Sequence, residues 1–164
     1  MQALQAAAGV LVSVLLTTAC AVQMAQPGMS REDVISRFGA PSRVLPLGAG
    51  TRLQYSGQPA GQTAVMVDLD AAGKVVRARE VLTLAEFSKI EVGKWTRADV
   101  EREFGRPARI DRVASWSGDI MNYRWHDAGA DKLFWVYLDA GNVVQRTGQG
   151  FEFREIRIRR KDDN

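Results

Sequence analysis

The feature that most constrains the fold of this chain is an internal repeat. Ser30–Pro41 reads SREDVISRFGAP and Thr96–Pro107 reads TRADVEREFGRP, so six of the twelve positions are identical. Unrelated segments of ordinary composition would share about one position. A repeat at a fixed offset indicates a duplicated structural unit, and we therefore expect two homologous halves.

Each copy carries the signals of one short helix. In the first copy Ser30 can cap the helix, Asp33 stands three residues later as in a capping box, and Gly39 followed by Pro41 ends the helix. The second copy has the same signals at the same offsets. The aspartates of the two copies could instead form a functional carboxylate pair, but capping accounts for both.

The segments after each helix have the pattern of antiparallel strands. In Thr63–Leu69 the apolar residues Val65 and Val67 alternate with Met66 and Asp68. Tight turns are expected at 70–73 and 139–142, and a last strand is expected at 151–158. We predict an α+β fold, in which two tandem helix-plus-antiparallel-sheet repeats form one continuous sheet with helices packed on one face.

The chain divides into five segments. Gly9–Leu16 is an apolar run too short to span a bilayer but of the length of a signal-peptide core. The predicted boundaries are a signal peptide over 1–19, a short tether over 20–27, a first repeat over 28–82, a second repeat over 83–158 and a charged tail over 159–164.

The segment LTTAC that ends at Cys20 resembles a bacterial lipobox. The resemblance implies cleavage before Cys20 and acylation of this residue, the only cysteine of the chain, with a fatty acid such as palmitate. Ala21 in place of an aspartate implies an outer-membrane lipoprotein that faces the periplasm. A tether of about eight residues would hold the folded part within roughly 30 Å of the membrane. The alternative is a plain secretory signal with an incidental cysteine.

The two repeats resemble a lipoprotein family. The pattern of Gly-x-Ser/Thr-Arg-x-x-Val, then Phe-Gly-x-Pro, then Asp-x-Gly-x-Val, occurs over Gly28–Val75 and again over Gly93–Val143. The last motif of the first copy and the first motif of the second copy each contain one additional residue. It is similar to the BamE-like (SmpA/OmlA) outer-membrane lipoprotein domain. That resemblance implies a non-enzymatic module that binds an envelope protein, with the β-barrel assembly machinery as a candidate partner. The duplication is also similar to the β-lactamase inhibitor protein fold, which implies an alternative function as a binder of a periplasmic hydrolase.

The sequence offers little for catalysis. His126 is the only histidine, and no cluster of histidine and cysteine has the spacing of a metal site. We therefore expect no enzyme, no metal, no cofactor and no small-molecule substrate. A net charge of +3 is too small to indicate nucleic-acid binding. The remaining enzymatic alternative is a water-activating site that depends on His126.

Aromatic residues on one strand are the candidate binding site. In Lys132–Leu138, Trp135 and Tyr137 alternate with apolar residues, and by the repeat they match Met66 and Asp68. We expect these four residues and Arg124 to lie on an exposed sheet face that binds the partner. The alternative is that the C-terminal strand or a loop covers them, while Trp116 is expected to pack locally in a loop.

Overall fold

The computed structural model describes residues 24–153. The signal peptide, Cys20, the first residues of the tether and the charged tail lie outside this range. The elements are α1 (Arg31–Phe38), β1 (Arg43–Leu47), β2 (Gly50–Ser56), β3 (Ala64–Leu69), β4 (Val75–Glu80), α2 (Leu84–Phe87), α3 (Arg97–Phe104), β5 (Arg109–Asp111), β6 (Ile120–Asp127), β7 (Ala130–Leu138) and β8 (Val144–Phe151). Most of the last strand expected over 151–158 lies outside the described residues, and Phe151 is the last residue of β8.

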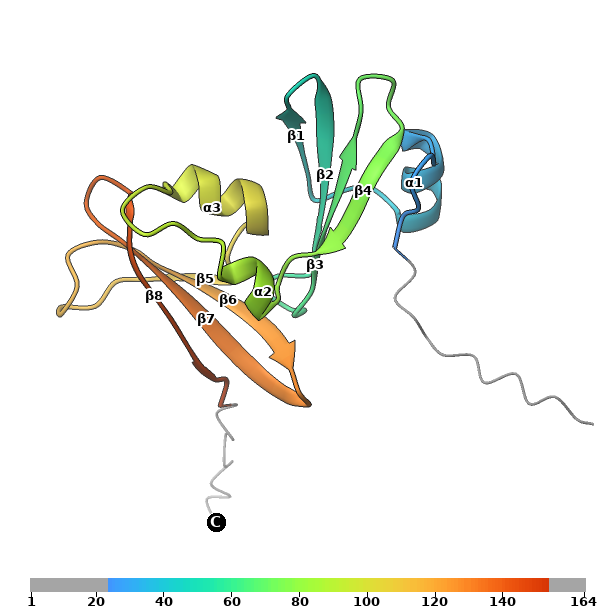
Figure 1. Cartoon of the computed structure of the whole chain (residues 1–164). Helices are drawn as coiled ribbons and strands as arrows, with labels where there is room; N and C mark the ends of the chain where they lie inside the picture. The colour runs from blue at the N-terminus through green and yellow to red at the C-terminus, as the bar shows by residue number, and fades with distance from the viewer. Residues whose placement is uncertain (1–23, 154–164) are drawn as a thin grey trace, which may run out of the picture.

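The two halves repeat one arrangement of a main helix followed by four antiparallel strands. One sheet has the order β1-β2-β3-β4 and the other has the order β5-β6-β7-β8 (Figure 1). Equivalent strands also share an irregularity, because the register shifts after Asp68 in the first sheet and after Tyr137 in the second. The short helix α2 precedes the main helix of the second repeat.

The predicted capping boxes are present at both main helices. The hydroxyl of Ser30 accepts a hydrogen bond from the Asp33 amide at 3.1 Å, and Thr96 accepts one from the Asp99 amide at 3.3 Å. Gly39 and Gly105 end the helices with φ of 81° and 80°, but with extended ψ rather than the left-handed helical conformation. This backbone region is open almost only to glycine, which explains why a glycine ends each main helix.

A tyrosine fastens the end of each main helix to the second strand of its own repeat. The Tyr55 hydroxyl donates to the carbonyl of Gly39 at 3.1 Å, and the Tyr123 hydroxyl donates to the carbonyl of Gly105 at 2.8 Å. The first pair is partly exposed, whereas the second is buried. The same tyrosine–glycine hydrogen bond therefore occurs in two environments that differ in burial.

The prediction of one continuous sheet with helices on one face is wrong. The structure has two separate sheets, and α3 lies between them, with α1 on the far side of the first sheet (Figure 1). The reason is that β3 is apolar on both faces. Val67 packs with Val34 of α1, while Met66 joins the larger core with Val100 and Phe104 of α3.

The larger core is aromatic and belongs mostly to the second repeat. Phe87 of α2 stacks on Phe134 with ring centroids 4.0 Å apart, and it also contacts Trp125 edge to face at 5.6 Å. This packing fixes which side of the second sheet faces inward. The other side of that sheet carries the candidate site.

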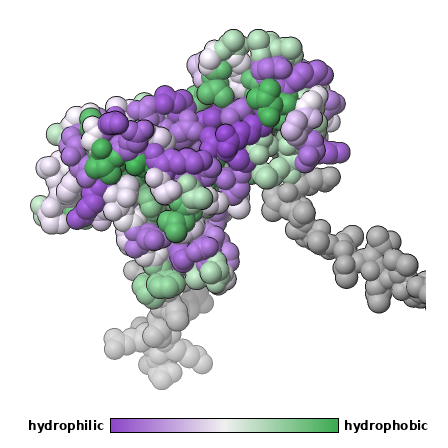
Figure 2. Space-filling view, in the orientation of Figure 1, coloured by the Kyte–Doolittle hydropathy of each residue, from purple (hydrophilic) through white to green (hydrophobic). Residues whose placement is uncertain are grey.

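Charged and polar groups join the first sheet to α3. The Arg52 guanidinium binds Asp68 at 2.6 Å and Glu103 at 2.8 Å, and the Gln54 amide donates to the carbonyls of Glu101 and Arg102 at 3.0 Å each. Figure 2 shows hydrophilic residues over much of this junction. The Gln54 amide thereby supplies a donor to the Arg102 carbonyl in the last turn of α3, where carbonyls lack partners within the helix. The Glu101 carbonyl also accepts the Gly105 amide at 2.9 Å.

None of the helices formed within residues 24–153 combines the length and the hydropathy of a membrane-spanning helix.

Candidate functional site

Trp135 and Tyr137 lie on the side of the second sheet that faces away from its core. Register places Ile120 and Asn122 of β6 and Arg146 of β8 on the same side. We call this surface the aromatic face and define it by Ile120, Asn122, Trp135, Tyr137 and Arg146. No helix or strand within residues 24–153 packs over it (Figure 1).

The indole of Trp135 lies across β8 because that strand has glycine where a side chain would interfere. A Cβ at Gly150 would lie 2.7 Å from the indole, and one at Gly148 would lie 3.3 Å from it. The indole therefore covers backbone that two glycines leave bare, and it remains partly exposed. This arrangement makes Trp135 a flat platform on the sheet.

Tyr137, Trp116 and Arg146 form a second cluster beside this platform. The rings of Trp116 and Tyr137 meet edge to face at 5.3 Å, and the guanidinium of Arg146 lies 4.0 Å from the centre of the Tyr137 ring and 5.4 Å from that of Trp116. The Trp116 indole nitrogen donates to the carbonyl of Leu138 at 2.7 Å. Cation–π contacts of this kind hold a guanidinium while leaving its N–H groups available.

Trp116 belongs to the site, which sequence reasoning missed. It was expected to pack locally in a loop, and it does lie in the loop 112–119, but the loop folds onto the aromatic face. In the first repeat only residues 48 and 49 join the equivalent strands. The additional length of this connection in the second repeat was the sequence signal that could have identified it.

Asn122 lies in the floor of a hollow of about 520 Å³ that the aromatic face forms with the loop. Its side-chain nitrogen donates to the carbonyl of Ile120 at 3.0 Å and to a carboxylate oxygen of Asp111 at 3.2 Å. Its side-chain oxygen is buried and has no hydrogen-bond partner within the described chain. The hollow thus combines aromatic walls, a cation and an unpaired acceptor.

Met66 and Asp68 are not part of this surface, contrary to expectation. Met66 is fully buried under α3, and Asp68 is 6% exposed and paired with Arg52. They occupy the strand positions equivalent to Trp135 and Tyr137, but the second repeat covers that side of the first sheet. The prediction that these two residues lie on an exposed sheet face is therefore wrong.

Arg124 shares a sheet side with Trp135 but is engaged within the chain. Its guanidinium binds Glu152 at 2.6 Å and the carbonyls of Pro59 and Ala60 at 2.7 and 2.9 Å. The hydrogen bond that Arg124 donates to Glu152 raises the pKa of Arg124. Arg124 thus holds a loop of the first repeat against the second sheet instead of facing a partner.

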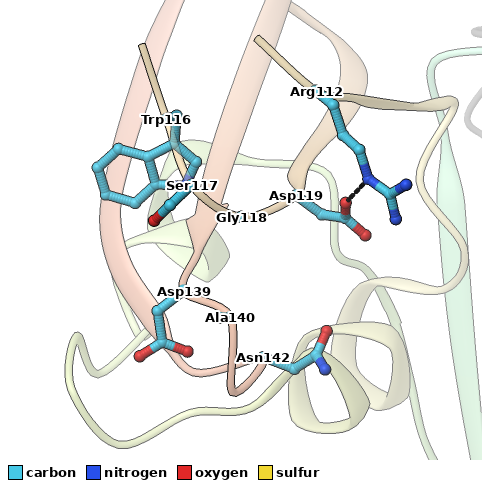
Figure 3. Close-up of a pocket in the computed structure, with 8 residues that line it drawn as sticks. All are labelled: Arg112, Trp116, Ser117, Gly118, Asp119, Asp139, Ala140 and Asn142. Carbon is cyan, nitrogen blue, oxygen red and sulfur yellow. Dashed lines mark hydrogen bonds and ion pairs between the residues drawn. The ribbon is translucent and has the colours of Figure 1, made fainter. Parts of the chain in front are cut away.

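A neighbouring polar pocket of about 320 Å³ contains two carboxylates with structural roles. Figure 3 shows Asp119 directed at Arg112, with Asp139 on the other side of the pocket. The hydrogen bond from Arg112, followed by that from Arg97, lowers the pKa of Asp119. Asp139 accepts the amides of Gly141 and Val143 at 2.9 Å each in a turn. Both carboxylates are satisfied by the fold itself.

His126 is exposed near the end of β6. Its Nδ1 atom lies 3.1 Å from a carboxylate oxygen of Asp131. Over residues 24–153, no group of three or more histidine, cysteine, aspartate or glutamate side chains is arranged to hold a metal ion.

Comparison with known proteins assigns no family. No family model matches the chain, and no curated protein matches it. A solved structure of a DUF4309 family protein (YjgB) from Bacillus subtilis matches 75% of this chain and 78% of its own, at 17% sequence identity and a TM-score of 0.31. A similarity of this degree supports no conclusion about fold or function.

Proposed function

We propose that this chain is a non-enzymatic envelope protein that binds a protein partner through its aromatic face. The proposal rests on one observation. Trp135, Tyr137 and Arg146 lie beside Trp116 on one side of the second sheet, and no helix or strand of the described chain covers that side. Tryptophan, tyrosine and arginine are the residues that most often dominate the energetics of protein interfaces.

The proposal includes a lipid anchor at Cys20, on the sequence resemblance to a lipobox. Outer-membrane attachment at the periplasmic face would place the aromatic face near other envelope proteins. The resemblance to BamE-like domains makes the β-barrel assembly machinery the first partner to examine. Mass spectrometry of the mature amino terminus tests the anchor, because an unacylated Cys20 would exclude it.

Affinity capture tests the binding proposal. The wild-type chain is used to isolate partners from outer-membrane extracts, and the affinity of each purified partner is then measured by calorimetry. The double variant Trp135→Ala/Tyr137→Ala is expected to weaken binding at least about a hundredfold, because two interface anchors of about 2 kcal/mol or more are removed. Val44→Ala, at an exposed position of β1, is the control.

Unchanged affinity in the double variant, with its circular dichroism spectrum intact, would show that the partner binds elsewhere. The alternative partner is a periplasmic hydrolase that the chain inhibits through the same face. Loss of the activity of a purified hydrolase at stoichiometric protein would support this alternative, whereas co-purification with barrel-assembly components would support the first.

A further inference from the structure

The aromatic face has an internal counterpart that is already occupied. Trp135 and Tyr137 of β7 take the positions of Met66 and Asp68 of β3, and Arg146 takes the position of Arg77, since Arg146 pairs with Tyr137 as Arg77 pairs with Asp68. In the first repeat this side of the sheet is covered by α3. The junction between β3 and α3 therefore shows what kind of segment this side of a repeat accepts.

The segment that covers the first repeat is acidic. Glu101 of α3 binds Arg43 at 3.2 Å, and Glu103 binds Arg52 and Arg79 at 2.8 Å each. The carboxylates of one helix are thus held by arginines of the facing sheet. Charge pairing and apolar packing together join the two halves.

Arg146 is the arginine that the aromatic face presents. Its equivalent, Arg77, is exposed and binds none of the α3 carboxylates named above, which are held by Arg43, Arg52 and Arg79. The guanidinium of Arg146 has no ion-pair partner among residues 24–153 and lies against the rings of Tyr137 and Trp116. The nearby carboxylates are engaged elsewhere, because Asp111 binds Arg109 at 2.7 Å and Asp119 binds other arginines. Arg146 is therefore exposed and available to a carboxylate of a bound molecule.

The side-chain oxygen of Asn122 adds no requirement of its own. It accepts no hydrogen bond from the described chain, but the atom is inaccessible to solvent, so a bound molecule does not reach it. The side-chain nitrogen of Asn122 donates to Asp111 within the chain. A polypeptide that presents a carboxylate to Arg146 and apolar side chains to the rings meets the requirements of the face.

We propose that the aromatic face binds an acidic segment of the partner protein, with Arg146 pairing to an aspartate or glutamate of that segment. The inference rests on the proposed function and adds the chemistry of the partner to it. The aromatic rings pack against the apolar parts of that segment, as Met66 does against α3 in the first repeat.

A phage-displayed library of random peptides, selected on the immobilised full chain, provides the probe. Selected peptides are synthesised, and their affinities are measured by fluorescence anisotropy. We expect enrichment of aspartate and glutamate, and a loss of affinity of about tenfold or more in Arg146→Gln. Arg77→Gln removes the same residue from the equivalent exposed position of the first repeat, and it is expected to change affinity less than about twofold.

The outcomes separate this inference from the proposed function. Peptides without acidic enrichment that bind Arg146→Gln normally but fail to bind Trp135→Ala/Tyr137→Ala would overturn the acidic-segment proposal and leave the binding face standing. Peptides that bind the double variant normally would overturn both. Vesicles containing phosphatidylglycerol provide the last comparison. Arg146-dependent binding to these vesicles, without peptide binding, would assign the cation to lipid and overturn the proposal.

Discussion

The two tyrosine–glycine bonds allow a controlled test of how burial changes the value of one hydrogen bond. Tyr55→Phe and Tyr123→Phe remove the same atom from equivalent positions of the two repeats. Tyr123 is fully buried and donates to a buried carbonyl, whereas Gly39, which accepts from Tyr55, is exposed. Burial also raises the pKa of Tyr123 well above its ordinary value, so the hydroxyl remains a donor.

The expected losses in the free energy of unfolding differ because only the Gly39 carbonyl can form a replacement hydrogen bond with water. Tyr123→Phe leaves the carbonyl of Gly105 without its donor in the core, and an unsatisfied buried group costs about 1–3 kcal/mol. We expect a loss of about 2 kcal/mol in the free energy of unfolding. In Tyr55→Phe water replaces the hydroxyl at Gly39, so the loss is expected to be about 0.5 kcal/mol or less.

Urea unfolding followed by far-ultraviolet circular dichroism measures both losses under one condition. Comparison requires that the slope of the free energy against urea remains the same in the wild type and both variants. The reasoning would be refuted by equal losses in the two variants, or by a larger loss in Tyr55→Phe.

Three further predictions concern burial, charge and the site. Met66→Ala should lower the free energy of unfolding by about 2–5 kcal/mol in urea, because it opens a cavity under α3; a loss below about 1 kcal/mol would place Met66 on an exposed face. Hydrogen bonds from the backbone and hydroxyl of Thr96 lower the pKa of Asp99 from its ordinary 3.8, so the folded state binds this proton less readily than the unfolded state. The ionised Asp99 therefore stabilises the folded state at neutral pH, and this stabilisation is lost as pH falls through 3.8 toward the lowered folded pKa. Asp99→Asn should have a lower free energy of unfolding at neutral pH, and that free energy should depend less steeply on pH below roughly pH 5. An unchanged dependence on pH would contradict this reasoning. Gly150→Val should push the indole of Trp135 off β8 and increase the iodide quenching of tryptophan fluorescence, whereas unchanged quenching would show that the indole does not lie there.

The alternation of β7 was sufficient to place Trp135 and Tyr137 on the side away from the core. The same alternation in β3 gave the wrong result for Met66 and Asp68 because that strand is covered on both sides. The apolar character of Ala64 and Met66 was a signal of this, since a strand buried on both faces is apolar on both. Nothing near β3 in the sequence identifies α3 as the element that covers it.

Arg124 and Trp116 also make contacts that the local sequence does not predict. A charged strand residue is ordinarily exposed, but Arg124 binds carbonyls of a loop more than sixty residues earlier. A loop tryptophan ordinarily packs locally, but Trp116 closes one side of the hollow. Both outcomes depend on partners whose position is set only when the two repeats pack together.

The sequence alone determined the duplication, the two capped helices with their terminal glycines, and the strands that follow them. These features depend on hydrogen bonds and backbone preferences within a few residues, which the local sequence determines. The tertiary structure alone decided that the sheets are separate, that α3 covers the first sheet, and that the aromatic face is left uncovered within the described chain. The physical reason is that two equivalent sheet sides differ only in what distant chain segment packs against them, and that choice depends on the summed apolar and ionic contacts of the whole fold.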